Sequence, residues 1–521
     1  MRFLQFMIVS FAVFTTALFG SCTSKEGSGE EPESPTTTSY KVRVKVSTGE
    51  YTRAGDDAAV NTLHLAFYNG EECLGIVEAT KDNDAYVCEI PAEYGKPDGV
   101  IAFANLPAGD LPTKDNVMTK TYSNFGNGDN MIMSSARYFD ASGNDKLKTP
   151  LSTMNLIEGG DAINIALDRI AAKVTVEKGT SVTYIGSVKV KRLGAETDLQ
   201  LSIINWGVSA VEKGSYLVKN FGIDKIDKTD IDNELNGWEE WNSTSSKLSH
   251  WAHSVTWDNS SYPSLIYDDN DYPLSYASIT SCGLSLGSQV YCHETTRLCE
   301  AYKINNALVS IILIGRYSIN TNSETFCIMK KDDQLQYYSV DNMKNEMAKQ
   351  QKILYSNNNP FTNGSGFDLK HPDWATNIPQ NYVTLQLSTN LINSIGSYTD
   401  ANGNGWTSSK VDFINKALAE ECGYVERFEN GKCYFIVPIR NNLEATNPDE
   451  ITGSYGLVRN HHYKITVNSI MGLGSGLVDS DSFVPLKYSY SGQSSMQYKV
   501  NANVSVNEWH DVNQIVDIPK N

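Results

Sequence analysis

Several sequence signatures of well-known protein classes are absent from this chain of 521 residues. There is no Walker A loop, no Rossmann glycine pattern after an expected strand, and no C-x-x-C pair. The single His-Glu pair, His293-Glu294, lacks the second histidine of a zinc-binding H-E-x-x-H helix. These absences argue against proteins that depend on those motifs, and we expect no enzymatic activity, no cofactor and no bound metal.

Basic charge and helix-forming runs are also in short supply. The formal net charge is -18, which lacks the basic footprint of a nucleic-acid-binding protein and is repelled by anionic lipid headgroups. Long runs of Ala, Leu, Glu and Lys are rare, whereas Gly, Asn, Ser, Thr and Tyr are plentiful. Because that mixture favours strands and turns, the composition predicts an all-β protein with no nucleic-acid partner.

Long hydrophobic runs are absent beyond residues 1–21. That first segment is apolar but interrupted by polar residues, so it is typical of a signal peptide rather than a membrane span. It ends in Leu18-Phe-Gly-Ser-Cys22, where small residues precede a cysteine as in a bacterial lipobox. This similarity implies a lipid on Cys22 and cleavage before it, with an ordinary secretory signal as the alternative. Residues 23–39 are rich in Ser, Thr, Pro, Glu and Gly and predict a flexible tether.

Two segments at opposite ends of the chain alternate strictly between apolar and polar residues. Apolar side chains occupy the even positions of both, and in a strand these share one face: they are Tyr40, Val42, Val44 and Val46 in the first segment, and Tyr498, Val500, Ala502, Val504 and Val506 in the second. The bond Arg53-Ala54, which suits a trypsin-like protease, follows the first segment. We interpret the first segment as a removable placeholder strand and the second as a strand donated to a neighbouring molecule.

The remaining strands predict two β-sandwich domains. Short strands up to Tyr216 assign residues 54–222 to an N-terminal domain, and residues 223–521 form a C-terminal domain with long loops. Periodicity predicts helices over 340–354 and 410–421, the second with Ser409 and Asp412 in capping-box spacing. Asn430-Gly431 predicts a hairpin that would place Cys433 across from Phe428 rather than Cys422.

Four groups of residues have a functional interpretation beside a structural one. One group is interpreted either as zinc ligands or as buried apolar cysteines: Cys282, Cys292-His293-Glu294 and Cys299. His461-His462 lie on one strand, where neighbouring rings face opposite sides, so a structural role is favoured. The acidic runs Asp56-Asp57 and 268–271 are interpreted either as calcium-binding loops or as solvated loops. Four tryptophans are interpreted either as a surface that stacks on sugar rings or as the aromatic core of a loop: Trp238, Trp241, Trp251 and Trp257.

An ordered set of segments carries a resemblance to a known family: Thr52-Arg-Ala54, Leu167-Asp-Arg-Ile-Ala-Ala-Lys-Val174, Asn205-Trp-Gly207, Ser215-Tyr-Leu-Val-Lys219, Tyr291-Cys-His-Glu-Thr-Thr296, Gly431-Lys-Cys-Tyr-Phe-Ile-Val-Pro-Ile439, Tyr455-Gly-Leu-Val-Arg-Asn-His-His-Tyr-Lys464, Ile470-Met-Gly-Leu-Gly474 and the closing strand with Trp509. With these segments, the chain resembles the fimbrillins of type V pili, the lipoprotein-precursor pilins of Bacteroidales, and in particular the major-subunit family of the minor fimbriae.

The resemblance implies two sandwich domains of transthyretin-like topology and export as an outer-membrane lipoprotein. It implies that an Arg-specific protease cuts Arg53-Ala54 and removes residues 22–53, which include the placeholder. The partners implied are identical subunits in a head-to-tail filament, together with accessory fimbrial subunits. The donor region is 498–518, where Trp509 breaks the alternation and indicates a bulge or kink. The alternatives are an accessory or tip fimbrial adhesin and an uncleaved surface glycan-binding lipoprotein.

Overall fold

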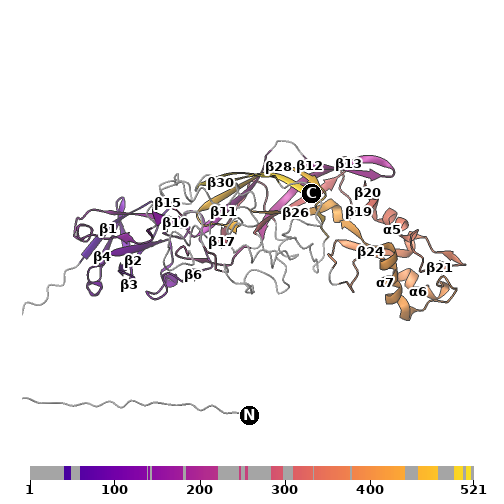
Figure 1. The fold of residues 1–521 in the computed structure, drawn as a ribbon, viewed down its shortest axis with the longest axis horizontal. Helices are drawn as coiled ribbons and strands as arrows, with labels where there is room; N and C mark the ends of the chain where they lie inside the picture. Colours follow the sequence, from indigo (N-terminus) through magenta and orange to yellow (C-terminus); the bar gives the residue numbers. More distant parts are fainter. Residues whose placement is uncertain are drawn as a thin grey trace, which may run out of the picture. The chain divides into compact units, whose positions relative to one another are not determined.

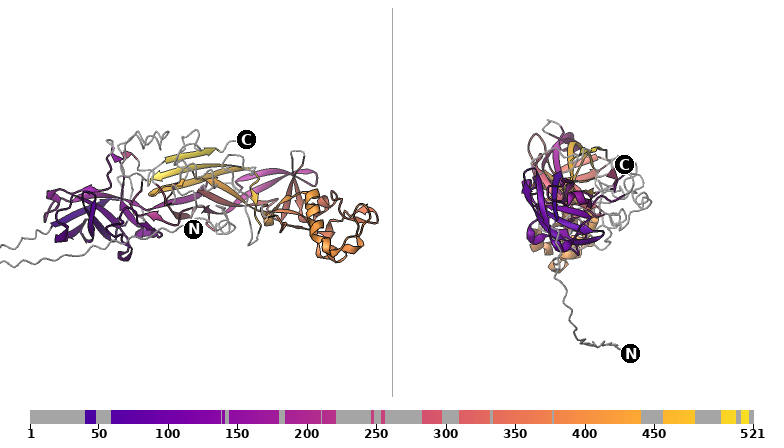
Figure 2. Two further views of the ribbon diagram at one scale, coloured as in Figure 1. Left: turned by 60° about the horizontal axis from the view of Figure 1, so that its bottom comes forward. Right: turned by 90° about the vertical axis from the view of Figure 1, so that its left-hand side faces the viewer.

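A computed structural model describes most of the chain from Tyr40 onwards (Figures 1 and 2). The described residues are 40–47, 59–137, 139–140, 144–179, 184–209, 211–220, 246–247, 253–255, 283–296, 309–331, 334–375, 378–439, 456–478, 498–508 and 512–517. Strands arranged in sheets dominate this part of the chain, and the helices are short. The predicted all-β class is therefore confirmed. Within the described residues, no helix has the length and apolar character needed to cross a membrane.

The first sheet is built from the N-terminal strands and closes on itself. Its order is β2-β3-β4-β1-β10-β7-β5-β9, and β5 pairs back onto β2. The strands are β1 (Tyr40–Ser47), β2 (Leu63–Asn69), β3 (Glu72–Asp82), β4 (Ala85–Ile90), β5 (Gly99–Ala104), β7 (Met133–Ser135), β9 (Thr149–Pro150) and β10 (Ile163–Arg169). Because β1 lies between β4 and β10, it completes the ring.

Apolar cores cover both faces of part of this ring. Val100, Ala102 and Ala104 of β5 point into one core, while Ile101 and Phe103 point into the other. All six residues of β5 are buried, which explains why its sequence is a continuous apolar run rather than an alternating one.

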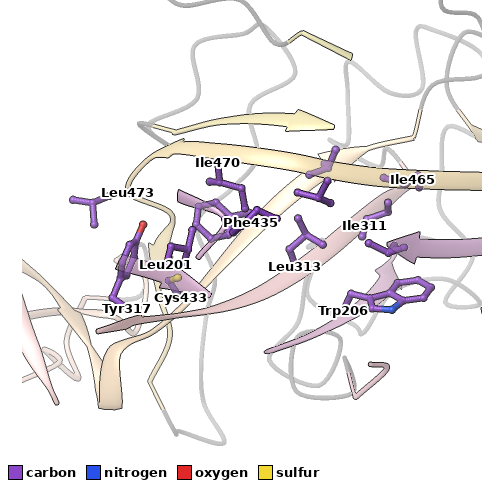
Figure 3. Packing of buried hydrophobic residues seen from close by; sticks show 14 of the residues in the cluster. Leu201, Trp206, Ile311, Leu313, Tyr317, Cys433, Phe435, Ile465, Ile470 and Leu473 are labelled. Carbon is purple, nitrogen blue, oxygen red and sulfur yellow. The ribbon is translucent and has the colours of Figure 1, made fainter. Parts of the chain in front are cut away.

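Two further sheets form a sandwich from strands in residues 171–209 and strands from residue 289 onwards. The smaller has the order β16-β11-β28-β30-β31, made of β11 (Ala171–Lys178), β16 (Gln289–His293), β28 (His461–Gly472), β30 (Tyr498–Glu508) and β31 (Val512–Asp517). The larger has the order β23-β24-β25-β19-β20-β12-β13-β18-β26-β29, made of β12 (Gly186–Arg192), β13 (Ala195–Ser209), β18 (Ser310–Ser318), β19 (Phe326–Lys331), β20 (Gln334–Ser339), β23 (Phe367–Lys370), β24 (Tyr382–Leu387), β25 (Val425–Phe428), β26 (Lys432–Pro438) and β29 (Ser475–Gly476). Figure 3 shows the core between them, where Ile465 and Ile470 of β28 face Ile311, Leu313 and Phe435 of the larger sheet.

Helices cover the end of the larger sheet and enclose a core of their own. This core includes Met343 and Met347 of α5 (Val340–Ala348), Leu391 of α6 (Thr389–Asn393) and Ile414 and Leu418 of α7 (Val411–Cys422), which pack against β23 and β24. Both expected helices form, but α5 ends at Ala348 rather than near 354. The expected capping box at α7 is wrong: Lys410 is the N-cap residue and no side chain caps this end.

Four two-stranded ladders complete the described structure. They pair β14 (Ser215–Tyr216) with β6 (Thr121–Tyr122), β15 (Ser246–Lys247) with β8 (Phe139–Asp140), β17 (Thr295–Thr296) with β27 (Gly456–Leu457), and β21 (Tyr355–Ser356) with β22 (Asn359–Pro360).

The chain leaves the N-terminal core after Ile170 and returns to it at Leu217 and Val218, so residues 54–222 do not form one continuous domain. Strands β11, β12 and β13 were expected to finish the N-terminal domain, yet they pair with β28, β20 and β18 of the C-terminal half. Their side chains belong to the C-terminal core. Alternation shows which face of a strand is buried, but it does not show which sheet the strand joins.

The expected hairpin at Asn430-Gly431 is also wrong. Both residues have the positive φ of a tight turn, 50° and 70°. However, β25 before the turn pairs with β19 and β24, whereas β26 after it pairs with β18. Cys433 consequently lies opposite Gly315 instead of Phe428. Among the described residues, Cys422 and Cys433 are free thiols, as are Cys73, Cys88, Cys292 and Cys327.

Candidate functional site

Strand β1 contributes one face to the N-terminal core. Val42 and Val44 are 0% exposed, and Tyr40 and Val46 are partly buried against the same core. These are the four even positions that were predicted to share a face. The structure therefore places the expected placeholder residues inside the apolar ring.

The backbone of β1 is paired along both edges. Tyr40 to Val44 pair antiparallel with β4, which sets Val42 opposite Cys88 and Val44 opposite Tyr86. Val44 to Ser47 pair parallel with β10, which sets Val44 beside Ile163 and Val46 beside Ile165. In the described residues no pairing joins β4 to β10 directly. The ring would therefore open at this position if β1 were absent.

The outward face of β1 carries three cations, and each of them meets carboxylates. Lys41 Nζ lies 3.3 Å from Glu89 and 3.2 Å from Glu158. Arg43 lies 3.4 Å from Asp82 and 3.8 Å from Asp84, and Lys45 Nζ lies 2.6 Å from Asp84. We call these four carboxylates the acidic rim.

The rim and the strand shift one another's pKa values in the direction that favours charge. Hydrogen bonds to Glu158 and then Glu89 raise the pKa of Lys41. The hydrogen bond from Lys45 lowers the pKa of Asp84. These side chains are solvent-exposed, so their pairs contribute little stability and serve mainly to orient the strand.

The C-terminal alternating segment forms β30 in another sheet. It pairs antiparallel with β28 from His461–Glu508 to Gly472–Tyr498, and antiparallel with β31 on its other side. The structure therefore does not bring β1 and β30 together within one chain. The pieces on either side of Trp509, β30 and β31, pair antiparallel with Val506 opposite Val512. Residues 509–511, where a bulge or kink was expected, lie outside the described part of the chain.

Several predicted residues lie outside the described part of the chain. They are Cys22, Arg53, Ala54, the acidic runs Asp56-Asp57 and 268–271, Cys282, Cys299, and the tryptophans 238, 241, 251 and 257. The lipid site, the cleavage site and the calcium and sugar interpretations therefore stay predictions.

The sequence reasoning missed a buried ionic cluster made of Arg459, Glu294, Lys219 and Asp168, which we call the Arg459 cluster. Arg459 and Glu294 have side chains 0% and 1% exposed, with Nη2 of Arg459 2.9 Å from Oε2 of Glu294. Arg459 also donates to the carbonyls of Leu217 at 3.1 Å and Tyr216 at 2.6 Å. The three nitrogens of this buried guanidinium thus each donate to a carboxylate or a carbonyl oxygen.

The second ion pair of the cluster joins Lys219 to Asp168 at 3.4 Å. Burial lowers the pKa of Lys219, and the charge of Asp168 opposes this effect. Asn460 links the second pair to the backbone, since its side chain donates to Asp168 at 3.0 Å and accepts from the Arg169 amide at 3.3 Å. Four of the segments that carry the family resemblance, around residues 168, 216, 294 and 460, therefore meet at one buried site.

The candidate metal residues have structural partners. His293 Nδ1 lies 3.1 Å from Ser215 Oγ, and burial lowers its pKa. His461 Nδ1 donates to the Arg459 carbonyl at 2.7 Å, while His462 Nε2 lies 3.0 Å from Thr175 Oγ1. Within the part of the chain that the structure describes, no three His, Cys, Asp or Glu side chains gather as a metal site.

One further string, Gly283-Leu-Ser-Leu-Gly287, is spelled like the nucleophile elbow of a hydrolase. An elbow lies between a strand and a helix, whereas this string is followed by strand β16. The Ser285 carbonyl accepts a hydrogen bond from the Trp206 indole at 2.9 Å. The surroundings are those of a packing turn beside a buried tryptophan.

Comparison with known proteins identifies the C-terminal part of the chain. Residues 426–514 match the family model described as "Major fimbrial subunit protein type IV, Fimbrillin, C-terminal". This C-terminal region is that of a fimbrillin. Over residues 426–514, the resemblance inferred from the sequence segments is therefore confirmed. The fimbrillin region contains β28 and β30, and Arg459 lies just before β28.

A search of curated protein sequences found no match to this chain. Similar solved structures include a fimbrilin (FimA) from Porphyromonas gingivalis W83, with 14% identity, 92% of this chain and 98% of that chain covered, and a TM-score of 0.35. A putative cell adhesion protein from Bacteroides eggerthii has 8% identity, covers 92% and 96%, and has a TM-score of 0.36. The tip fimbrial protein Mfa3 from Porphyromonas gingivalis, with a C-terminal truncation, has 11% identity, covers 90% and 99%, and has a TM-score of 0.30.

Proposed function

We propose that this fimbrillin polymerises into surface fimbriae by protease-triggered donor-strand exchange, and that β1 is the strand that is exchanged. The observation that carries the proposal is the position of β1. It is the first described strand, it lies between two others in a closed ring, and it buries Val42 and Val44 completely. In the sequence, residues 48–58 separate β1 from the next described residues of the ring.

Loss of β1 would leave the ring with an apolar groove and two unpaired edges. Val42 and Val44 each stabilise the fold by roughly 1.5–3 kcal/mol through burial. The facing edges of β4 and β10 would lose their backbone partners, and such edges are templates for pairing with another chain. A strand from a second subunit would restore both the side-chain burial and the backbone hydrogen bonds.

Cleavage at Arg53-Ala54 would start the exchange and release the subunit from the membrane at the same time. In the proposed precursor, a lipid on Cys22 holds the chain at the outer membrane, and the tether and β1 lie between that cysteine and Arg53. A trypsin-like Arg-specific protease that cuts after Arg53 would convert β1 into a separate peptide. While β1 is covalently linked, it rebinds the groove at a high effective concentration. After cleavage this advantage is lost, so a strand from another subunit can displace the β1 peptide.

The C-terminal strand is the proposed donor. It alternates over nine residues, 498–506, and pairs antiparallel with β28 in this chain. Head-to-tail donation uses two different surfaces of each subunit, so it propagates as an open filament. A tip subunit needs only a groove that accepts a strand. This chain has an alternating C-terminal strand as well as a replaceable β1, which favours a stalk subunit. We propose accessory fimbrial subunits as its further partners.

Cys88 allows the proposed opening of the groove to be measured. It is 1% exposed opposite Val42, and burial raises the pKa of its thiol to about 12. We expect maleimide to leave Cys88 unmodified in the precursor, to modify it during assembly of the cleaved protein, and to leave it unmodified in finished filaments. Mass spectrometry of the Cys88 peptide measures this.

Cys433 is the internal control, because it is 0% exposed in the C-terminal core and should stay unmodified throughout. Electron microscopy and unheated gels follow the filaments in the same samples. Cleavage after Arg53 without filaments or heat-sensitive ladders contradicts the polymerisation proposal. Filaments that form while Cys88 is never modified contradict the removal of β1.

A further inference from the structure

We infer that the donor strand enters the groove in the same direction and register as β1, with Tyr498, Lys499 and Val500 taking the places of Tyr40, Lys41 and Val42. This inference rests on the proposed function and specifies which part of the C-terminal region is inserted. The occupant is residues 498–504 of a second copy of this chain. The segment 512–518 is the alternative that the experiment below distinguishes.

The first argument is a repeated sequence. Tyr40-Lys-Val42 and Tyr498-Lys-Val500 are identical, and without gaps the segments 40–46 and 498–504 agree at positions 40, 41, 42 and 46. Both then continue the same alternation of apolar and polar residues. Since successive strand residues face opposite sides, the alignment sends every apolar residue of the donor into the core. The segment 512–518 has no comparable match, because Ile515 and Gln514 interrupt the alternation.

The second argument is charge. Lys499 is the single charged residue between Tyr498 and Asn507. In the proposed register it takes the position of Lys41, where Glu89 and Glu158 already hold an ammonium group at 3.3 Å and 3.2 Å. A shift by two residues keeps the apolar face inward but places Asn501 against these carboxylates. The acidic rim therefore distinguishes registers that the apolar core alone does not.

The third argument concerns volume. Ala502 takes the position of Val44, whose side chain is 0% exposed between Tyr86 and Ile163. The donor then fills this part of the groove less completely than β1 does. Restoring the two missing methyl groups should make the filament harder to dissociate.

Disulfide trapping with the native Cys88 tests the register. Cys88 lies opposite Val42, so the proposed register puts Val500 opposite Cys88 in the neighbouring subunit. We expect Val500→Cys filaments assembled under mild oxidation to give a covalent ladder on heated non-reducing gels, with the introduced thiol joined to Cys88 in the peptide map. Val42→Cys in the uncleaved precursor is the positive control, because it should form the same bridge within one chain.

Ala502→Cys and Val516→Cys are the comparison variants. A bridge from Ala502→Cys to Cys88, with none from Val500→Cys, would mean a strand shifted by two residues or reversed. A bridge from Val516→Cys would mean that β31 is inserted. Either result overturns the register while filaments still form and the proposed function stands. Unsubstituted, cleaved protein that forms no filaments would instead overturn the proposed function.

Ala502→Val keeps the register testable if the Val500→Cys subunit fails to assemble. We expect its filaments to dissociate in detergent at a temperature several degrees above that of the unsubstituted filaments. Asn501→Val, which changes an outward position of the same strand, is the matched control and should produce no such rise. An unchanged or lower dissociation temperature for Ala502→Val counts against the placement of residue 502 at the Val44 site.

Discussion

Replacing Val44 with aspartate lowers the free energy of unfolding of the N-terminal ring by about 3–5 kcal/mol, because it removes a buried apolar side chain and introduces a carboxylate without a partner. Val44 is 0% exposed and lies beside Ile163 of β10 and opposite Tyr86 of β4, with no basic group on that face of β1 to pair with the new charge. Urea denaturation of the uncleaved precursor measures the loss. Under the proposed function, the same variant should also form heat-sensitive ladders without protease, because β1 no longer holds the groove.

Ser47→Asp is the matched control for this prediction. It introduces the same charge on the same strand at an exposed position, so it should change the free energy of unfolding by less than about 0.5 kcal/mol. A Val44→Asp precursor as stable as the Ser47→Asp precursor would show that β1 does not contribute to the ring in solution. If the Val44→Asp precursor is destabilised but stays monomeric, β1 packs in the ring as described. The same result contradicts the proposal that β1 blocks polymerisation.

Replacing Glu294 with alanine should lower the free energy of unfolding by about 3–5 kcal/mol, since the guanidinium of Arg459 would stay buried without its carboxylate. Oε1 of Glu294 also accepts from the backbone amide of Arg459 at 3.2 Å, so the substitution removes a backbone partner as well. Urea denaturation followed by tryptophan fluorescence measures the change, with buried Trp206 among the reporters of the C-terminal core.

Glu196→Ala is the control because it breaks an ion pair that water already solvates. Lys189 and Glu196 are 69% and 65% exposed, so this variant should lose no more than about 1 kcal/mol. Glu294→Gln should fall between the two, because an amide oxygen still accepts from Arg459 without the charge. Equal losses for Glu294→Ala and Glu196→Ala would show that the Arg459 cluster is not buried in solution.

Sequence periodicity was sufficient to identify both strands of the proposed exchange. Alternation placed β1 and β30 within one or two residues of their ends, and the apolar run 100–104 correctly indicated a strand buried on both faces. These are local properties, since the burial of one face or of both faces is written directly into the order of side chains along a strand.

The same reasoning failed where the outcome depended on partners distant in sequence. Asn430-Gly431 adopts turn angles, but its flanking strands separate because β25 finds β19 and β26 finds β18. Strands β11 to β13 were assigned to the wrong core for the same reason. Neither turn chemistry nor alternation specifies a partner strand, since many strands present the same row of backbone donors and acceptors.

For β1, the sequence alone determined that residues 40–46 form a strand with one apolar and one polar face, and that residues 498–504 repeat this alternation. Only the tertiary structure decided that β1 completes a closed ring between β4 and β10, with Cys88 opposite Val42 and carboxylates beside each of its cations. It likewise decided that Arg459 and Glu294, 165 residues apart, form one buried pair. The physical reason is that periodicity records the environment of a single strand, whereas ring closure and buried ion pairs arise from contacts between segments that no local pattern relates.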